Sequence, residues 1–324
     1  MSKLISIVLP THNKCDYLRF TMPLLKEQVV RNADDVELVV CNNASTDETA
    51  TYLKELSTAD PFFRFKDYTD YVDIGVSIAR SVDNAEGKYV LLWGDDDIPA
   101  PLLLDTLLDY IKHNPDVACY HFNRLAGTDS KDFSITELSV FNKKYTGQGI
   151  KYSNTSEFIS NYYQGMGFLS ADMFLLEAWN NGKHIDCSKH YGFEFLAPIF
   201  WGIQGRPCMY IDYPLCIQRN PNNRKWLSRS PMFRYIGMPN LLQDLEKMGL
   251  ISNWRQTWNR NSNTTKKYIS IIPQITLDKK KYRKLIKEMN GYQTSVWRKL
   301  YALFMLYCMP TTFYLFLRNL RYRQ

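Results

Sequence analysis

The sequence predicts an α/β protein with a mixed, mostly parallel β-sheet flanked by helices, followed by a helical C-terminal region rich in basic and aromatic residues. Over about the first 125 residues, short apolar runs alternate with segments of helical character. That alternation is typical of β-α-β units with right-handed crossovers. Hydrophobic residues make up 45% of the chain and charged residues 23%, which excludes a disordered protein.

The predicted strands are short runs rich in β-branched and other apolar residues. A strand buried on both faces of a parallel sheet has this continuous apolar character. We expect strands at 4–9, 36–41, 62–68, 89–93 and 117–122. Helices are expected at 15–30, from the turn after residue 47 to about 56, at 75–85 and at 101–113.

The rest of the chain is less regular. Residues 126–165 are polar and rich in tyrosine. The elements expected after them are a strand at 168–176, a short helix from 177, a helix at 192–202, an extended segment at 207–218 and helices from about 233 onward.

Polar side chains follow three of the predicted strands. They are Pro10-Thr11-His12, Asn42-Asn43 and Asp95-Asp96-Asp97. Ligands of parallel sheets bind at the carboxyl ends of the strands, so we expect these residues to converge on one crevice.

The acidic triplet Asp95–Asp97 is the strongest chemical signal in the sequence. Three adjacent carboxylates after a buried strand repel one another and resist desolvation unless a cation neutralises them. Ligands that offer only oxygen suit Mg²⁺ or Mn²⁺. The structural alternative is that the aspartates cap the helix that begins near Pro101.

The order of motifs around the triplet resembles that of family 2 glycosyltransferases, in particular the bacterial enzymes that build O-antigen or capsular polysaccharide. The resemblance covers about residues 4–125 and implies the fold called GT-A. Its motifs are VLPTHNK at 8–14, VVCNNASTD at 39–47, DIG at 73–75, AR at 79–80, AEGKY at 85–89 and LWGDDD at 92–97.

The resemblance implies a set of site residues. Asp96 and Asp95 would bind the metal, Mn²⁺ or Mg²⁺, and Asp97 would support the site or touch the donor sugar. Two departures stand out: an amide at Asn42 or Asn43 replaces a frequent aspartate, and Gly94 occupies the usual first aspartate of the D-x-D motif. The residues implied for the nucleotide-sugar donor are Pro10, Thr11, Asn13, Asn43, Asp73, Arg80 and Asp95.

A sugar acceptor needs a base, because its hydroxyl is a weak nucleophile. In inverting members of the family the base comes from the second half of the domain, and Glu194 is the best candidate there. Asp172 and His190 are alternatives, and Glu194 has the structural alternative of a helix-start residue favoured by the helix dipole.

We expect a GT-A catalytic domain at 1–220, with a nucleotide-sugar half at 1–125 and an acceptor half at 126–220, and a helical C-terminal region at 221–324. Residues 300–317 are apolar and aromatic, are interrupted by Pro310, and have basic residues on both sides, Arg318, Arg321 and Arg323 among them. A spanning helix needs ~20 apolar residues. An interfacial helix on an anionic membrane is therefore favoured, with core packing and a true span as alternatives.

The resulting prediction is a metal-dependent, inverting glycosyltransferase that extends a lipid-linked saccharide acceptor in surface polysaccharide synthesis. It would lie in the cytoplasm, on the inner face of the membrane, since the seven scattered cysteines suit a reducing compartment and contain no zinc motif. Nucleic acid is not expected as a partner, because the basic tail mixes its charge with long apolar stretches. A nucleotidyltransferase-like enzyme and a non-catalytic GT-A scaffold are the alternatives.

Overall fold

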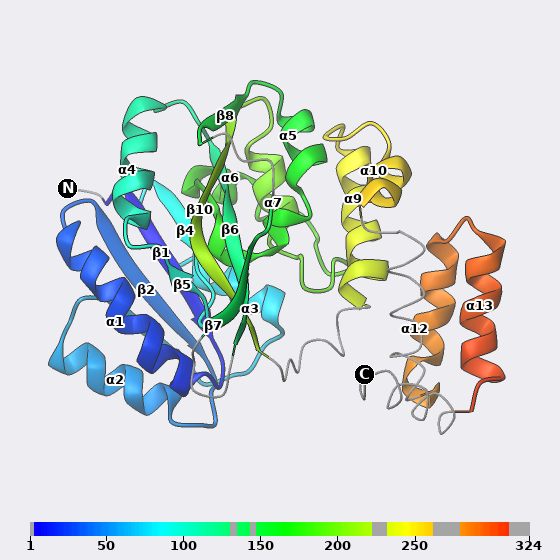
Figure 1. Cartoon of the computed structure of the whole chain (residues 1–324), viewed down its shortest axis with the longest axis horizontal. Coiled ribbons are helices and arrows are strands. Elements are labelled where there is room, and N and C mark those ends of the chain that lie inside the picture. The colour runs from blue at the N-terminus through cyan, green and yellow to red at the C-terminus, as the bar shows by residue number, and fades with distance from the viewer. Residues whose placement is uncertain (1–2, 130–134, 143–146, 222–231, 262–278, 311–324) are drawn as a thin grey trace. The chain divides into compact units, whose positions relative to one another are not determined.

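The computed structural model describes residues 3–129, 135–142, 147–221, 232–261 and 279–310 (Figure 1). The chain divides into two compact units. The first comprises Met1–Asp186 and Glu194–Arg224, and the second comprises Cys187–Phe193 and Lys225–Gln324.

The first unit is built on one sheet of ten strands, whose main path runs β3-β2-β1-β4-β9-β6-β10-β5, with β7 beside β6 and β8 beside β10. The predicted α/β fold, a mixed sheet flanked by helices, is confirmed. The strands are β1 (Ile5–Thr11), β2 (Val36–Asn43), β3 (Arg64–Tyr68), β4 (Tyr89–Leu92), β5 (Ile98–Pro99), β6 (Cys119–Asp129), β7 (Ile135–Val140), β8 (Gly149–Tyr152), β9 (Asp172–Leu175) and β10 (Cys208–Pro221).

The parallel part of the sheet carries the strand ends that matter for function. β1 pairs in parallel with β2 and with β4, and β2 pairs in parallel with β3. Thr11 lies opposite Asn42 in the β1–β2 register. The carboxyl ends of β1, β2 and β4 therefore lie at the same edge, as the sequence predicts.

The remainder of the sheet is mixed. β9 runs antiparallel between β4 and β6, whereas β6 and β10 are parallel to each other. The chain of β10 is long enough to pair also with β5 and β8, both antiparallel.

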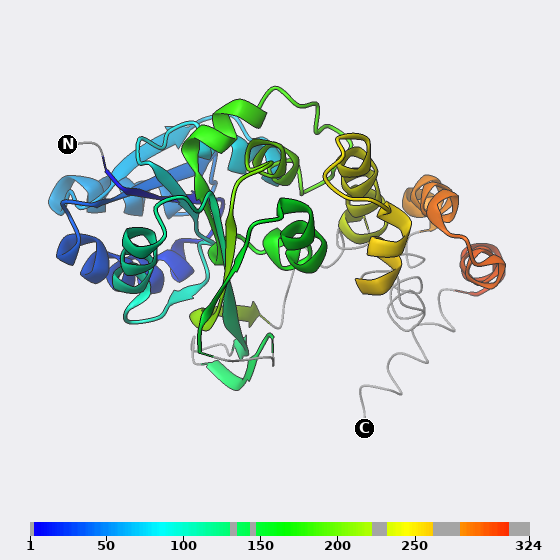
Figure 2. The ribbon, with the colours of Figure 1, turned by 90° about the horizontal axis from the view of Figure 1, so that it is seen from above.

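Helices cover both faces of this sheet (Figures 1 and 2). Helices α1 (Cys15–Arg31), α2 (Thr49–Ala59) and α4 (Leu103–His113) pack on one side, and α3 (Ile74–Val82), α6 (Leu176–Gly182) and α7 (Leu196–Gly202) on the other. Helix α5 (Thr155–Tyr162) lies against β8 and β10. The indole N–H of Trp179 in α6 donates to Asp83 at the end of α3, at 2.9 Å.

The core of the first unit follows from the apolar runs. Every residue of β4 is buried, as are Ile5 and Val8 of β1. In α4 the buried residues are Leu103, Leu104, Leu107 and Ile111, which is the one-sided spacing of an amphipathic helix on a sheet.

The predicted helix at 192–202 is shorter in the structure. Helix α7 begins at Leu196, and residues 191–195 are not helical. Tyr191 and Gly192 both have positive φ, 40° and 86°, which is incompatible with a continuous helix across them.

The second unit is helical in its described residues. A π-helical turn, Phe233–Gly237, leads into α9 (Met238–Lys247), and α10 (Trp254–Asn261), α12 (Lys279–Tyr292) and α13 (Val296–Tyr307) follow. Tyr235 and Trp258 are buried and their rings meet edge to face, with centroids 6.2 Å apart.

The predicted apolar segment at 300–317 is described only in part. Its first residues belong to α13, whereas 311–317 and the basic residues Arg318, Arg321 and Arg323 lie outside the described residues. None of the helices in the part of the chain that the structure describes has the length and apolar character needed to cross a membrane.

Candidate active site

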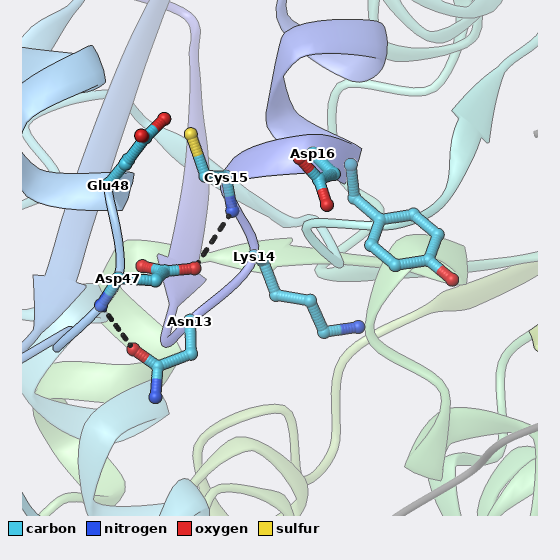
Figure 3. Close-up of a pocket in the computed structure, with 7 residues that line it drawn as sticks. Asn13, Lys14, Cys15, Asp16, Asp47 and Glu48 are labelled. Carbon is cyan, nitrogen blue, oxygen red and sulfur yellow. Dashed lines mark hydrogen bonds between the residues drawn. The ribbon is translucent and has the colours of Figure 1, made fainter.

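The loop after β1 is held in place by its own side chains. Asn13 has a left-handed backbone, with φ of 55°. Its side-chain oxygen accepts hydrogen bonds from the backbone N–H groups of Thr46, at 2.7 Å, and Asp47, at 3.3 Å. Figure 3 draws the bond from Asp47. The Asp47 carboxylate in turn accepts from the N–H of Cys15, at 3.4 Å. The β1 loop and the β2 loop are thereby tied together at the edge of the sheet.

These two loops enclose a hollow of about 380 Å³ (Figure 3). Its polar lining comes from both loops and from the first turn of α1. The lining residues are Asn13, Lys14, Cys15, Asp16, Tyr17, Asp47 and Glu48.

Asp95 and Asp96 share one cationic partner. The Lys14 ammonium lies 2.6 Å from an Asp96 carboxylate oxygen and 3.7 Å from one of Asp95. Thr11 also donates its hydroxyl to Asp95, at 2.8 Å. Burial works against the charge on Lys14, but the charges of Asp95 and Asp96 outweigh it and raise the pKa of Lys14.

Burial is also the main influence on Asp95. It raises the pKa of this carboxyl group to about 6, helped by the charge of Asp96 and opposed by Lys14 and Thr11. Because burial disfavours the ionised form of Asp95, a further positive charge beside it would stabilise the carboxylate.

Asp97 lies in a different environment from its two neighbours. It is buried and accepts hydrogen bonds from the Ser170 hydroxyl, at 2.6 Å, and from the backbone N–H of Arg219, at 3.4 Å. Burial and the neighbouring charge of Asp96 raise its pKa well above the ordinary value. Leu102 is the residue that precedes helix α4, so the triplet does not cap that helix.

Ser170 explains why a glycine stands at position 94. Its hydroxyl accepts the N–H of Gly94, at 2.7 Å, while it donates to Asp97. A Cβ on Gly94 would lie 2.6 Å from an Asp97 oxygen and 3.2 Å from the Ser170 hydroxyl. The position of the usual first aspartate therefore has no room for a side chain.

Asn43 and Arg80, both predicted to face the donor, hold each other. The Asn43 amide bonds to the backbone carbonyl and N–H of Val72, at 2.9 and 3.1 Å, and accepts from Arg80, at 2.7 Å. The Arg80 guanidinium stacks on Tyr68, 3.7 Å from its ring centroid, and pairs with Asp70 at 3.0 Å. Together they fix the chain between β3 and α3.

Pro10 and Asp73, also predicted to bind the nucleotide-sugar donor, have defined positions in the backbone fold. Pro10 lies in β1 opposite Cys41 of β2. Asp73 is the residue immediately before helix α3, in an extended conformation. His12 also lies at this edge: its ring Nδ1 donates to the Asn43 carbonyl, at 2.8 Å, and its ring contacts that of Tyr71, with centroids 4.9 Å apart.

Glu194 packs against the first turn of α3. A Cβ built on Gly75 would lie 1.7 Å from a carboxylate oxygen of Glu194 and 2.4 Å from its carboxyl carbon. Glu194 therefore lies beside the start of α3, the helix that Asp73 directly precedes. Because α7 starts two residues later, Glu194 does not belong to the first turn of a helix, as the structural alternative assumed.

The alternative bases are engaged elsewhere. Asp172 is fully buried in β9 and one of its oxygens lies 2.7 Å from the ring of His121, which is also buried. His190, buried in the second unit, lies 3.0 Å from Asp244 of α9.

The acidic edge suits a divalent ion that arrives with a substrate. Asp95 and Asp96 already reach a single cation in common. Within the described residues, no three His, Cys, Asp or Glu side chains come together in a way that would hold a metal ion by themselves. Mg²⁺ is commonly bound through one or two carboxylates together with substrate phosphates, and the donor set here fits that kind of site.

Lys14 and Ser170 are the two residues whose part in this edge the sequence did not reveal. Lys14 stands in the first-loop motif, and its position after Asn13 was a usable signal, because the carboxyl ends of β1 and β4 meet. No signal in the sequence pointed to Ser170, which lies 73 positions from Asp97.

Several known proteins are similar to this chain in sequence or in fold. Glycosyltransferase GlyA of Streptococcus pneumoniae serotype 4 is 30% identical over 152 residues, 45% of this chain and 21% of GlyA. GlyG of the same organism is 22% identical over 195 residues, 57% of this chain and 63% of GlyG. The chain thus spans less than two thirds of either relative.

The crystal structure of S. aureus TarS 1–349 in complex with UDP-GlcNAc superposes with a TM-score of 0.61 at 12% identity, covering 94% of this chain and 88% of that chain. A likeness at this identity concerns the fold, and it confirms the expected GT-A architecture. Residues 6–171, just over half of the 324, match the sequence profile described as Glycosyl transferase family 2. The matched region runs from β1 through the acidic triplet to Ser170, and this chain therefore belongs to glycosyl transferase family 2.

Proposed function

We propose that this protein is a metal-dependent glycosyltransferase that moves a sugar from a nucleotide-sugar donor to a saccharide acceptor with inversion at the anomeric carbon. The observation that carries the proposal is the pair Asp95 and Asp96, which share one cation at the carboxyl edge of the family's fold. A diphosphate is the substrate group that such an edge, with a divalent ion, binds best.

The donor would bind between the β1 loop and the start of α3. Thr11 and Asn13 fix the loop that faces the diphosphate. The nucleoside side of the donor site would be lined by Pro10, Asn43, Asp73 and Arg80. Asn43 and Arg80 would form one wall of it, since they are hydrogen-bonded to each other. The complex of TarS with UDP-GlcNAc supports a nucleoside diphosphate sugar as the donor class.

The chemistry follows from the residues at the edge. Asp95 and Asp96 would hold Mg²⁺ or Mn²⁺, which when bound neutralises the charge that develops on the leaving diphosphate. The acceptor hydroxyl oxygen bonds to the anomeric carbon as the bond from that carbon to the phosphate oxygen breaks. Glu194 would take the proton of the hydroxyl. Asp97, held by Ser170, would keep Asp95 and Asp96 in position.

The experiment is donor turnover with a panel of nucleotide sugars and Mn²⁺. The variant Asp96→Ala should lose turnover while its melting temperature stays close to that of the wild type. Asp109→Ala, which removes an exposed carboxylate of α4 beside His113, is the matched control and should keep full activity. Unchanged turnover in Asp96→Ala would refute the assignment.

The acceptor is proposed to be a lipid-linked saccharide of a bacterial surface polysaccharide, met on the cytoplasmic face of an anionic membrane. Helix α13 supports this, because it exposes a run of large apolar side chains beside Arg298 and Lys299. That combination is typical of interfacial helices. The exposed side chains are Val296, Trp297, Leu300, Leu303, Phe304 and Tyr307.

Sedimentation with vesicles tests the membrane proposal. The protein should bind vesicles containing phosphatidylglycerol, and Trp297→Ser, at a side chain 82% exposed, should weaken binding. Leu102→Ser, at a side chain 62% exposed in the first unit, is the control and should leave binding unchanged. Equal binding by all three proteins would argue against α13 as the contact.

A further inference from the structure

Lys14 has a position that the proposed reaction does not require. Its ammonium contacts both carboxylates to which the proposed function assigns the metal, at 2.6 Å from Asp96 and 3.7 Å from Asp95. An oxygen ligand of Mg²⁺ lies at about 2.0–2.1 Å from the ion. An ion that binds Asp95 and Asp96 together would take the position beside both carboxylates that the ammonium occupies, so binding of the metal there requires Lys14 to move.

The backbone of Lys14 is anchored, which leaves its side chain as the part that moves. Its N–H donates to the Thr49 hydroxyl at 3.0 Å, and the preceding Asn13 is fixed to the β2 loop. The side chain is 29% exposed, and its ammonium lies 4.6 Å from the centroid of the Tyr17 ring. Lys14 lines the hollow between the two loops.

Moving this ammonium has an electrostatic cost. A lysine that leaves a partly shielded pair of carboxylates loses its ionic partners while a second positive charge is placed nearby. A metal ion alone offers nothing in return. A diphosphate does, since it brings negative charge for the displaced ammonium as well as oxygen ligands for the metal.

We infer that Lys14 is a built-in competitor of the metal: it occupies the cation position of Asp95 and Asp96 in the free protein and yields it only when the divalent ion and a nucleoside diphosphate bind together. The inference rests on the proposed function, because it takes Asp95 and Asp96 as the metal ligands. It makes the binding of metal and nucleotide cooperative, and the cooperativity is reciprocal. The free protein would then neither collect metal ions nor hold the nucleotide without them.

The test is a titration of Mn²⁺ followed by the electron paramagnetic resonance signal of the free ion, which needs no turnover. The wild type, Lys14→Met, Lys14→Arg and Lys26→Met are compared without nucleotide, with uridine diphosphate and with guanosine diphosphate. Lys26 lies in α1, the helix that Lys14 directly precedes, but pairs with Asp60, so its variant controls for the loss of one positive charge.

We expect a diphosphate to tighten Mn²⁺ binding to the wild type by a factor within the range of roughly 5–150 that is usual for coupled sites. Lys14→Met should bind Mn²⁺ alone more tightly than the wild type and should gain less from the diphosphate than the wild type does, because only the oxygen ligands of the diphosphate still contribute. Lys14→Arg keeps the positive charge and should behave like the wild type, as should Lys26→Met. Melting curves of each variant establish that it is folded.

Three results would overturn the inference. If the wild type and Lys14→Met bind Mn²⁺ alone equally well while the diphosphate still binds with the metal, the competition is absent and the proposed function stands. If diphosphate binding needs Lys14 but no metal, the lysine is the permanent cation of the site. If no folded variant binds Mn²⁺ with either diphosphate, the proposed function fails together with the inference.

Discussion

Gly75 sets the position of the proposed base, and adding one methyl group to it should uncouple activity from stability. A Cβ on Gly75 would lie 1.7 Å from a carboxylate oxygen of Glu194. Favourable non-bonded contacts begin near ~3.5 Å, so the carboxylate of Glu194 must move by roughly 1.5 Å or more in Gly75→Ala. A misplacement of about 1 Å can cost on the order of 100-fold in rate. We therefore expect kcat to fall at least about 100-fold, equivalent to roughly 2.7 kcal/mol of transition-state stabilisation.

The free energy of unfolding should change little in the same variant. The clash is with the end of a flexible side chain, and alanine is favoured over glycine by roughly 0.5–1 kcal/mol inside a helix. Urea denaturation measures stability, the melting shift with uridine diphosphate and Mn²⁺ measures donor-site binding, and saturating donor and acceptor give kcat. Gly291→Ala, where no atom lies within 4 Å of the added Cβ, is the control.

Two outcomes would refute the reasoning about Gly75. Retention of more than half of kcat in Gly75→Ala, with Glu194→Gln at least 100-fold impaired, would mean that the contact does not fix the base. Full activity in both variants would mean that Glu194 is not the base at all.

Two further predictions concern stability. Ser170→Ala removes the acceptor of the Gly94 N–H and the hydroxyl that donates to Asp97, so urea denaturation should show a loss of about 1–3 kcal/mol in the free energy of unfolding. The control is Ser57→Ala, whose hydroxyl makes one exposed hydrogen bond to the Lys54 carbonyl, and it should lose under about 0.5 kcal/mol; equal losses in the two variants would contradict the bridging role of Ser170. In the second unit, burial opposes ionisation of Asp244, but hydrogen bonds from Lys247 and His190 outweigh it and lower its pKa from the ordinary 3.8. The stability that Asp244 adds is therefore present above about pH 4 and lost as the pH falls through the lowered pKa. The difference in the free energy of unfolding between the wild type and Asp244→Asn should therefore narrow from pH 5 to pH 3. A constant difference would show that the folded protein does not favour the ionised form of Asp244.

The strands and their polar ends were predictable because they depend on local sequence. Apolar runs such as the one in β1 must be buried, and in a parallel sheet their carboxyl ends must meet. The approach of the Asp95–Asp97 loop to Thr11 follows from these two rules alone, and the structure confirms it at 2.8 Å. The helix at 192–202 was overextended because the positive φ angles of Tyr191 and Gly192 leave no clear mark in the apolar pattern.

Side-chain partnerships between distant segments were not predictable in the same way. Ser170 meets Asp97 across 73 positions, and Glu194 meets Gly75 across a separation of more than one hundred. Each depends on how β9 and the chain before α7 pack against the parallel strands. A serine or glycine at these positions looks like any other in the sequence. What distinguishes Gly94 and Gly75 is that a Cβ at either position would clash with a neighbouring side chain. That clash can be recognised only once the positions of Asp97, Ser170 and Glu194 are known.

The three aspartates of the triplet show why adjacent identical residues do not share one role. The chain after β4 turns so that Asp95 and Asp96 face Lys14, whereas Asp97 turns inward to Ser170 and the Arg219 N–H. A third metal-facing carboxylate would add repulsion that one lysine cannot offset in the free protein. Directing Asp97 into the sheet removes that carboxyl group from the edge, and its hydrogen bonds to Ser170 and the Arg219 N–H hold the loop. The acidic edge thus carries two carboxylates, a number that one ammonium satisfies in the free protein. Two carboxylates would also leave coordination positions for a diphosphate on a divalent ion that replaced the ammonium, as we propose.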